Sequence, residues 1–170
     1  MLKDQKTLAF INMFAVLGTL EDLCREAHEE TARILTNKKP VSLALAVKDG
    51  PSAAFTFENG YCRVKPGVHP CNVKLPFSSC EKFNGLIDGT VTPIPSKGFT
   101  HIGFLTKDFT KLTDLLSFYL QKAPEDNEIS TKLLFYTISS AISQIGNHDE
   151  IGSFSASNIV DGTVMLSIKD

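Results

Sequence analysis

The chain has 170 residues and a mass of 18.6 kDa, a size that suits one domain with its own hydrophobic core. Apolar residues make up 42% of the sequence and charged residues 21%, which excludes a disordered chain, a collagen and a coiled coil. The 17 basic residues are offset by 19 acidic ones. The net charge of -2 therefore gives no excess that would attract nucleic acid or an anionic membrane.

Two features of the sequence bear on the cellular compartment. The apolar stretch 8–17 is short and contains Asn12, so we expect neither a membrane span nor a signal peptide. The four cysteines show no C-x-x-C spacing, which favours free thiols over disulfides or a metal centre. We therefore expect a protein of the reducing cytoplasm.

The N-terminal part of the chain predicts two helices. Apolar residues recur at helical spacing from residue 4 to 17, and Gly18 is expected to end this helix because glycine suits a helix terminus. Thr19 is expected to cap a second helix over residues 20–36, whose apolar residues share one face.

After Asn37 the apolar period changes from 3.6 to 2, which is typical of half-buried strands. Strands are predicted over residues 41–47, 53–58, 61–65 and 71–75. Asn59-Gly60 is a strong hairpin signal because both central residues of a type I′ turn need positive φ. We therefore expect these strands to form a sequential antiparallel meander.

Capping signals indicate the next helix. Ser78 to Glu81 matches a capping box, with Phe77 placed as a hydrophobic staple, and Gly89 is expected to end the helix over residues 79–88.

Residues 99–105 are predicted as a fifth strand because apolar residues alternate again after a connection with two prolines. A helix with a wide apolar stripe then begins at Thr106 or Asp108 and runs to about Gln121.

The last part of the chain predicts a helix and a hairpin. Pro124 separates residues 124–170 from the preceding helix, and a new helix is predicted over residues 128–145. Its inward side is expected to carry Leu134, Ile138, Ala141, Ile142 and Ile145. Asp161-Gly162 predicts a second type I′ hairpin. Because an isolated hairpin is marginally stable, we expect residues 124–170 to pack on the core, so that residues 1–170 form a single domain.

The sequence offers little for catalysis. Common nucleophile, zinc and phosphate-binding motifs are absent, so we expect no enzyme activity, no cofactor and no metal. His69 and Cys71 are the one close pair that could supply a base and a thiol nucleophile, but no third orienting group is evident. A thiol enzyme that uses Cys71 is therefore a third hypothesis for the function, after two non-catalytic hypotheses that are described below.

The apolar faces of residues 20–36, 79–88 and 107–121 are consistent with two interpretations. Three such faces can cover one side of a sheet as an ordinary core, or they can line a cavity for an apolar ligand.

The order of elements over residues 20–122 resembles the sterol carrier protein, or nonspecific lipid-transfer, domain family. The resemblance rests on the Asn59-Gly60 hairpin, the Phe83 to Gly89 segment, Gly103 and the Phe109 to Leu116 segment. It implies an α+β fold, with a five-stranded mainly antiparallel sheet, helices packed on one face and a hydrophobic tunnel between them. To this core the chain adds an N-terminal helix and, at residues 124–170, a helix and a β-hairpin.

The resemblance also implies a function without catalysis. We expect a lipid carrier that holds a fatty acid, acyl-coenzyme A, phospholipid or sterol, with at most transient membrane contact and no nucleic acid. The ligand is expected against the inward residues of two helices and the fifth strand: Phe83, Leu86, Ile87, Phe104, Leu112, Leu115, Leu116 and Tyr119. The alternative is a structural or regulatory module that oligomerises, for example as a homodimer, and whose cavity is closed by its own side chains.

Overall fold

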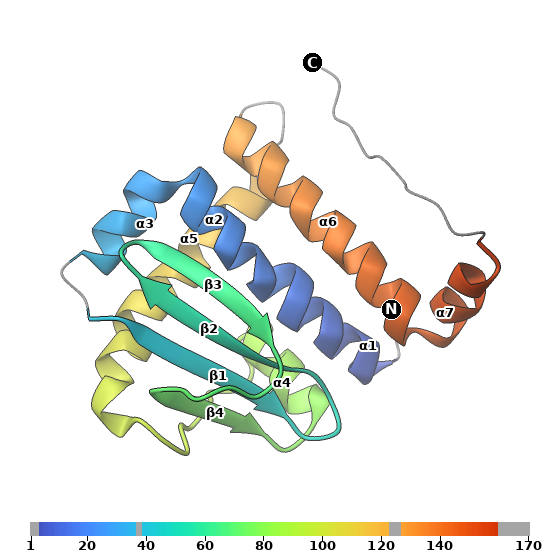
Figure 1. Cartoon of the computed structure of the whole chain (residues 1–170), viewed down its shortest axis with the longest axis horizontal. Coiled ribbons are helices and arrows are strands. Elements are labelled where there is room, and N and C mark those ends of the chain that lie inside the picture. Colours follow the sequence, from blue (N-terminus) through green and yellow to red (C-terminus); the bar gives the residue numbers. More distant parts are fainter. Residues whose placement is uncertain (1–3, 37–38, 123–126, 160–170) are drawn as a thin grey trace.

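A four-stranded mixed sheet forms one side of the molecule, and helices cover one of its faces (Figure 1). The computed structural model describes residues 4–36, 39–122 and 127–159. The strands are β1 (Val41–Val47), β2 (Ser52–Glu58), β3 (Tyr61–Pro66) and β4 (Val73–Phe77). They lie in the order β3-β2-β1-β4, and the type I′ turn joins β2 to β3 with positive φ at Asn59 and Gly60. The α+β class expected from the sequence is confirmed.

Strand β4 corrects the predicted meander. It pairs parallel with β1, at the far edge from β3, instead of antiparallel with β3. The connection 67–72 must therefore cross β2 and β1, a distance that six extended residues can span. Small side chains on the face away from the helices, such as the buried Ala44 and Ala54, leave room for this crossing. Hairpin rules consider only neighbours in sequence, so they could not reveal it.

The predicted fifth strand is wrong. Ser96 and Lys97 make a short antiparallel bridge to Lys74 of β4, and the pairing stops there. Gly98 follows with a φ of 85°, a left-handed conformation that turns the chain away from the sheet. Residues 99–101 form a 3₁₀ turn, and residues 104–109 form a π-helical segment that continues into α5 (Thr110–Gln121).

The N-terminal helix does not end at Gly18 as predicted. It runs from Gln5 to Glu26 as α1 (Gln5–Phe10), a π-helical segment, a 3₁₀ turn and α2 (Leu20–Glu26), and α3 (His28–Leu35) follows after a bend at Ala27. Thr19 does not cap a helix; its hydroxyl donates to the Ala15 carbonyl at 2.6 Å inside the same helix. Burial against neighbouring elements has outweighed the weak helix propensity of Gly18.

The length and composition of Gln5–Glu26 would also allow it to cross a membrane. However, 56% of its most apolar window is buried inside the fold, and the buried core helix of a soluble protein meets the same criterion.

Helix α4 (Cys80–Ile87) agrees with its capping signals. The cap is one residue later than the capping box suggests, because the Ser79 hydroxyl accepts a hydrogen bond from the Lys82 backbone N–H at 3.3 Å. Gly89 follows the helix with positive φ, as predicted.

The C-terminal helix is longer than predicted and faces a different way. Helix α6 (Glu128–His148) lies alongside the N-terminal helix, and α7 (Glu150–Ser157) folds back against the end of α6 (Figure 1). Ile138 and Ile142 were expected inward, but they are 56% and 58% exposed. The predicted hairpin at Asp161-Gly162 lies outside the described residues.

Both edges of the sheet are protected against pairing with another strand. On β3, the backbone N–H of Val64 donates to the Glu21 carboxylate of α2 at 3.0 Å. On β4, Lys74 is paired with the 96–97 segment, and Pro76 has no N–H to donate. Strand addition is therefore disfavoured at either edge.

Candidate functional site

The residues predicted to hold an apolar ligand lie in the core on the helical side of the sheet. Phe83, Phe104, Leu112, Leu116 and Tyr119 are buried, and the remaining three, Leu86, Ile87 and Leu115, are partly buried against the same core. They fall into two groups. Phe83 of α4 packs edge-on against Phe77, with ring centroids 5.2 Å apart, whereas Phe104 packs against Phe57 at 5.2 Å.

The N-terminal helix occupies the space that a ligand would need between these two groups. Its α1 end contacts α4 and its α2 end contacts α5. Met13 and Leu20 of this helix are fully buried, and Leu17 is nearly so, within the same core cluster. The sequence alone could not show that the N-terminal helix fills this space, because the apolar stripe of a helix does not show which surface the helix will cover.

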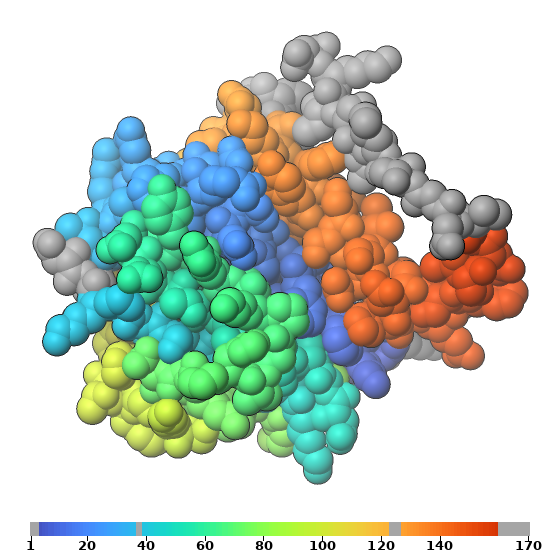
Figure 2. Space-filling view, in the orientation of Figure 1, coloured from blue at the N-terminus to red at the C-terminus, as the bar shows by residue number. Residues whose placement is uncertain are grey.

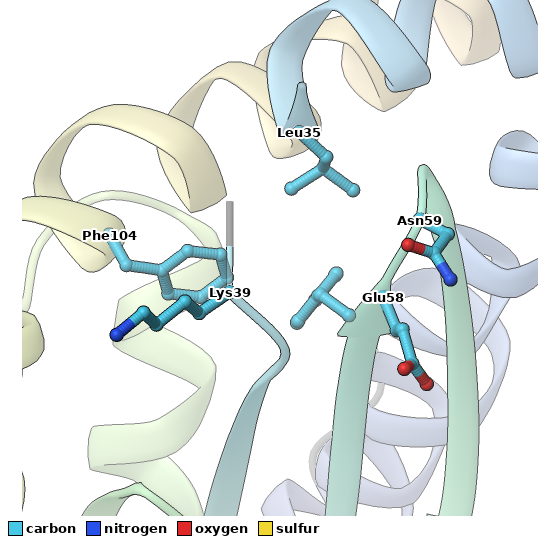
Figure 3. A pocket seen from close by; sticks show the side chains of 6 residues that line it. Leu35, Lys39, Glu58, Asn59 and Phe104 are labelled. Atoms are coloured by element: carbon cyan, nitrogen blue, oxygen red, sulfur yellow. The ribbon is translucent and has the colours of Figure 1, made fainter. Parts of the chain in front are cut away.

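A small cavity remains beside the second group (Figure 3). Leu35, Lys39, Phe57, Glu58, Asn59 and Phe104 line it. Its volume of about 10 Å³ is comparable to the smallest space that holds one water molecule. The interior at this point is closed to an acyl chain or a sterol.

Polar contacts fix the N-terminal helix in this position. The Asn12 amide donates to the Asn84 side-chain carbonyl at 3.0 Å. The Asn84 amide in turn donates to the backbone carbonyl and the side chain of Gln5, at 3.0 and 2.8 Å. Since Asn12 and Asn84 are both buried, breaking this network would leave polar groups without partners.

A second polar contact joins α3 to α5, near the group of core residues that contains Phe104. The Tyr119 hydroxyl of α5 donates to the Glu30 carboxylate of α3. Burial and this hydrogen bond raise the pKa of Tyr119 to about 12, so the phenol stays protonated and continues to donate at neutral pH.

A larger groove lies outside the core, where the end of β4 meets the start of α4. It is shallower and more open than the cavity beside Phe104, and it has a volume of about 400 Å³. Its lining residues are Pro76, Phe77, Ser78, Lys82, Val91, Thr92, Pro93 and Ile94. Ile94 is 75% exposed, which is unusual for a large apolar side chain in an ordered connection.

The wall of this groove is held in place from both ends. The Val91 N–H donates to the Gly85 carbonyl of α4 at 2.8 Å, and the Ser96 N–H donates to the Lys74 carbonyl of β4 at 2.9 Å. The sequence showed this segment only as an extended connection with two prolines. Val91 and Ile94, apolar residues in a proline-rich loop, were the signal that could have suggested a binding wall.

Lys82 is the one cation among the residues that line the groove. Within the described part of the chain, its ammonium group has no salt-bridge partner. The groove therefore combines apolar walls with one positive charge that is free to meet an anion.

The cysteines give no support to thiol chemistry. Burial raises the pKa of Cys24 to about 11 and also raises the pKa of Cys62, so both thiols stay protonated. His69 is close to the Pro66 carbonyl, with Nε2 at 2.8 Å from the oxygen, and no hydrogen bond joins it to Cys71 among the described residues. The described residues also contain no group of three or more side chains suited to a metal ion.

No family model, no curated protein and no solved structure matches the chain.

Proposed function

We propose that this protein is a non-catalytic binding protein for amphipathic anions, such as a fatty acid, and that the ligand lies in the groove between β4, α4 and the 91–94 segment. The observation that carries the proposal is the pairing of apolar walls with the unpaired ammonium group of Lys82. An apolar chain against Phe77, Val91 and Ile94 would lose contact with water, and its acidic head would meet the lysine.

The packing of the N-terminal helix among the predicted tunnel residues supports this location over the tunnel expected from the sequence. A ligand among Phe104, Leu112 and Leu116 would have to displace the N-terminal helix and its buried contacts, whereas the groove accepts a ligand without rearrangement. Binding at those core residues stays a prediction. The same packing equally favours the alternative expectation, a module that oligomerises, and the two functions are compatible because they use different surfaces.

Decanoate provides a direct probe of the groove. We expect isothermal titration calorimetry to detect decanoate binding, and Lys82→Glu to weaken it at least about tenfold, because a charge reversal replaces attraction by repulsion worth about 1.4 kcal/mol or more. Ile94→Ser should also weaken binding by removing an apolar wall, without loss of stability, since Ile94 is exposed.

The matched control is Lys65→Glu, which makes the same charge change on the exposed part of β3, at the other edge of the sheet. It should leave decanoate affinity unchanged within about twofold. Equal effects of Lys65→Glu and Lys82→Glu would show that only net charge matters and would remove the groove as the site.

A further inference from the structure

Helix α6 has an unusual distribution of side chains between its two faces. The side against the N-terminal helix carries the buried Leu133, aromatic contacts such as His148 on Phe10, and several polar contacts. The Thr137 and Thr19 hydroxyls are 2.8 Å apart, and the Ser140 hydroxyl donates to the Phe14 carbonyl at 3.1 Å. The large apolar residues Ile138 and Ile142, one helical turn apart, are instead more than half exposed.

Helix α7 adds to this exposed apolar surface. It packs on α6 through Gly152, which lies so close to Ile145 that an added Cβ would come within 2.4 Å of the Ile145 carbonyl oxygen. Its outer residues Ile151 and Phe154 are 77% and 72% exposed. Figure 2 shows α6 and α7 together at one end of the molecule. We call Ile138, Ile142, Ile151, Phe154 and Ile159 the α6–α7 apolar surface.

The charges around this surface limit the kind of partner. Residues 133–148 contain no Asp, Glu, Lys or Arg. Around Ile138 and Ile142, a charged partner would find nothing on this stretch of α6 to pair with, and its own charges would lose water without compensation. The acidic residues Asp149 and Glu150 follow only at the start of α7, and Glu150 is exposed. A partner surface that is also uncharged and apolar is complementary to this one. A second copy of this chain presents the same surface, because a two-fold dimer uses one patch on both subunits.

The size of the surface also fits a second copy. Its five side chains expose on the order of 400 Å² of apolar area, as large as the biggest patch on many monomers. A standard interface buries about 800 Å² on each partner, of which a little more than half is apolar. The 21 residues of α6 extend about 31 Å, so the helix is long enough to supply the polar part of such an interface beside the isoleucines.

We propose that the chain forms a homodimer in which α6 and α7 of one copy pack against α6 and α7 of the other about a two-fold axis. The α6–α7 apolar surface forms the centre of the interface, and uncharged residues of α6 such as Ser143 and Asn147 form its rim. The dimer does not depend on ligand binding at the groove.

Sedimentation equilibrium of the full chain tests the dimer. We expect a mass twice the monomer value of 18.6 kDa at micromolar concentration. The double variant Ile138→Asp with Ile142→Asp should weaken association at least about 30-fold. The milder Ile142→Ser should weaken it in the same direction if the double variant does not fold. As a control, Val68→Asp adds one of the same apolar-to-carboxylate changes at a 68% exposed residue of the 67–72 connection and should leave the dimer intact.

Two results would overturn the proposal. One is a monomer for the unmodified chain at micromolar concentration, and the other is a dimer that tolerates Ile142→Ser and the double variant as well as it tolerates Val68→Asp. A monomer that co-sediments with phosphatidylcholine vesicles would assign the surface to lipid instead. Decanoate titration of the same variants distinguishes this failure from failure of the proposed function, because the groove does not include these residues.

Discussion

Replacing Gly98 with alanine should destabilise the fold by about 3 kcal/mol or more. The residue has a φ of 85°, where a side chain is strained, and an added Cβ would lie 2.2 Å from the backbone oxygen of Asn72. Backbone atoms cannot swing aside as a flexible side chain can. The strain would also disturb the Ser96–Lys97 bridge to β4, which anchors one end of the groove wall.

Gly103→Ala is the matched control for this experiment. A Cβ at Gly103 would meet nothing within 4 Å, and the residue has helical backbone angles. We expect this variant to gain about 0.5–1 kcal/mol, since alanine is the better helix former. Urea unfolding measures both changes. A Gly98→Ala variant as stable as Gly103→Ala would contradict the described turn.

Asn84→Ala should cost about 2–4 kcal/mol in the free energy of unfolding. The change removes the partner of the buried Asn12 amide and both donations to Gln5, so α1 loses its polar attachment to α4. The comparison is Asn147→Ala. Among the described residues, the exposed Asn147 amide donates only to Ser143 of the same helix, so this change should alter stability by no more than about 0.5 kcal/mol.

A double-mutant cycle with Asn12→Ala separates this network from general packing. If Asn12 and Asn84 act as a pair, the double variant should be less destabilised than the sum of the single changes, with a coupling of about 0.5–3 kcal/mol. Strictly additive effects in chemical denaturation would mean that the network does not hold the N-terminal helix in place.

Local signals in the sequence predicted much of the secondary structure. The Asn59-Gly60 turn and the glycine after α4 occur as expected, and the cap at the start of α4 lies within one residue of its predicted place, because each is fixed by the backbone geometry of a few neighbouring residues. The alternating pattern of residues 41–47 and 53–58 likewise predicted strands where β1 and β2 lie.

The errors arose where distant contacts decide the structure. The parallel pairing of β4 depends on a connection that crosses the sheet, and the continuity of the helix through Gly18 depends on burial by several elements. The alternation at residues 99–105 looked like a strand, but the left-handed Gly98 directs the chain off the sheet.

The candidate site was harder to predict than the fold. Residues proposed for an interior tunnel do lie in the core, yet the sequence could not show that the N-terminal helix fills the space between them. The groove joins residues 76–78, Lys82 and residues 91–94 from three elements, and its volume exists only after those elements meet.

A decanoate titration followed by ¹H–¹⁵N NMR spectra of the labelled full chain tests the central claim, that a ligand binds at the surface groove while the interior stays closed. We expect the backbone amide shifts to change at Phe77, Lys82, Val91, Thr92 and Ile94, and to stay constant around the buried core of α5. Shifts concentrated at Phe104, Leu112 and Leu116, with Phe77 and Lys82 unaffected, would show that the ligand enters the core and would contradict the account.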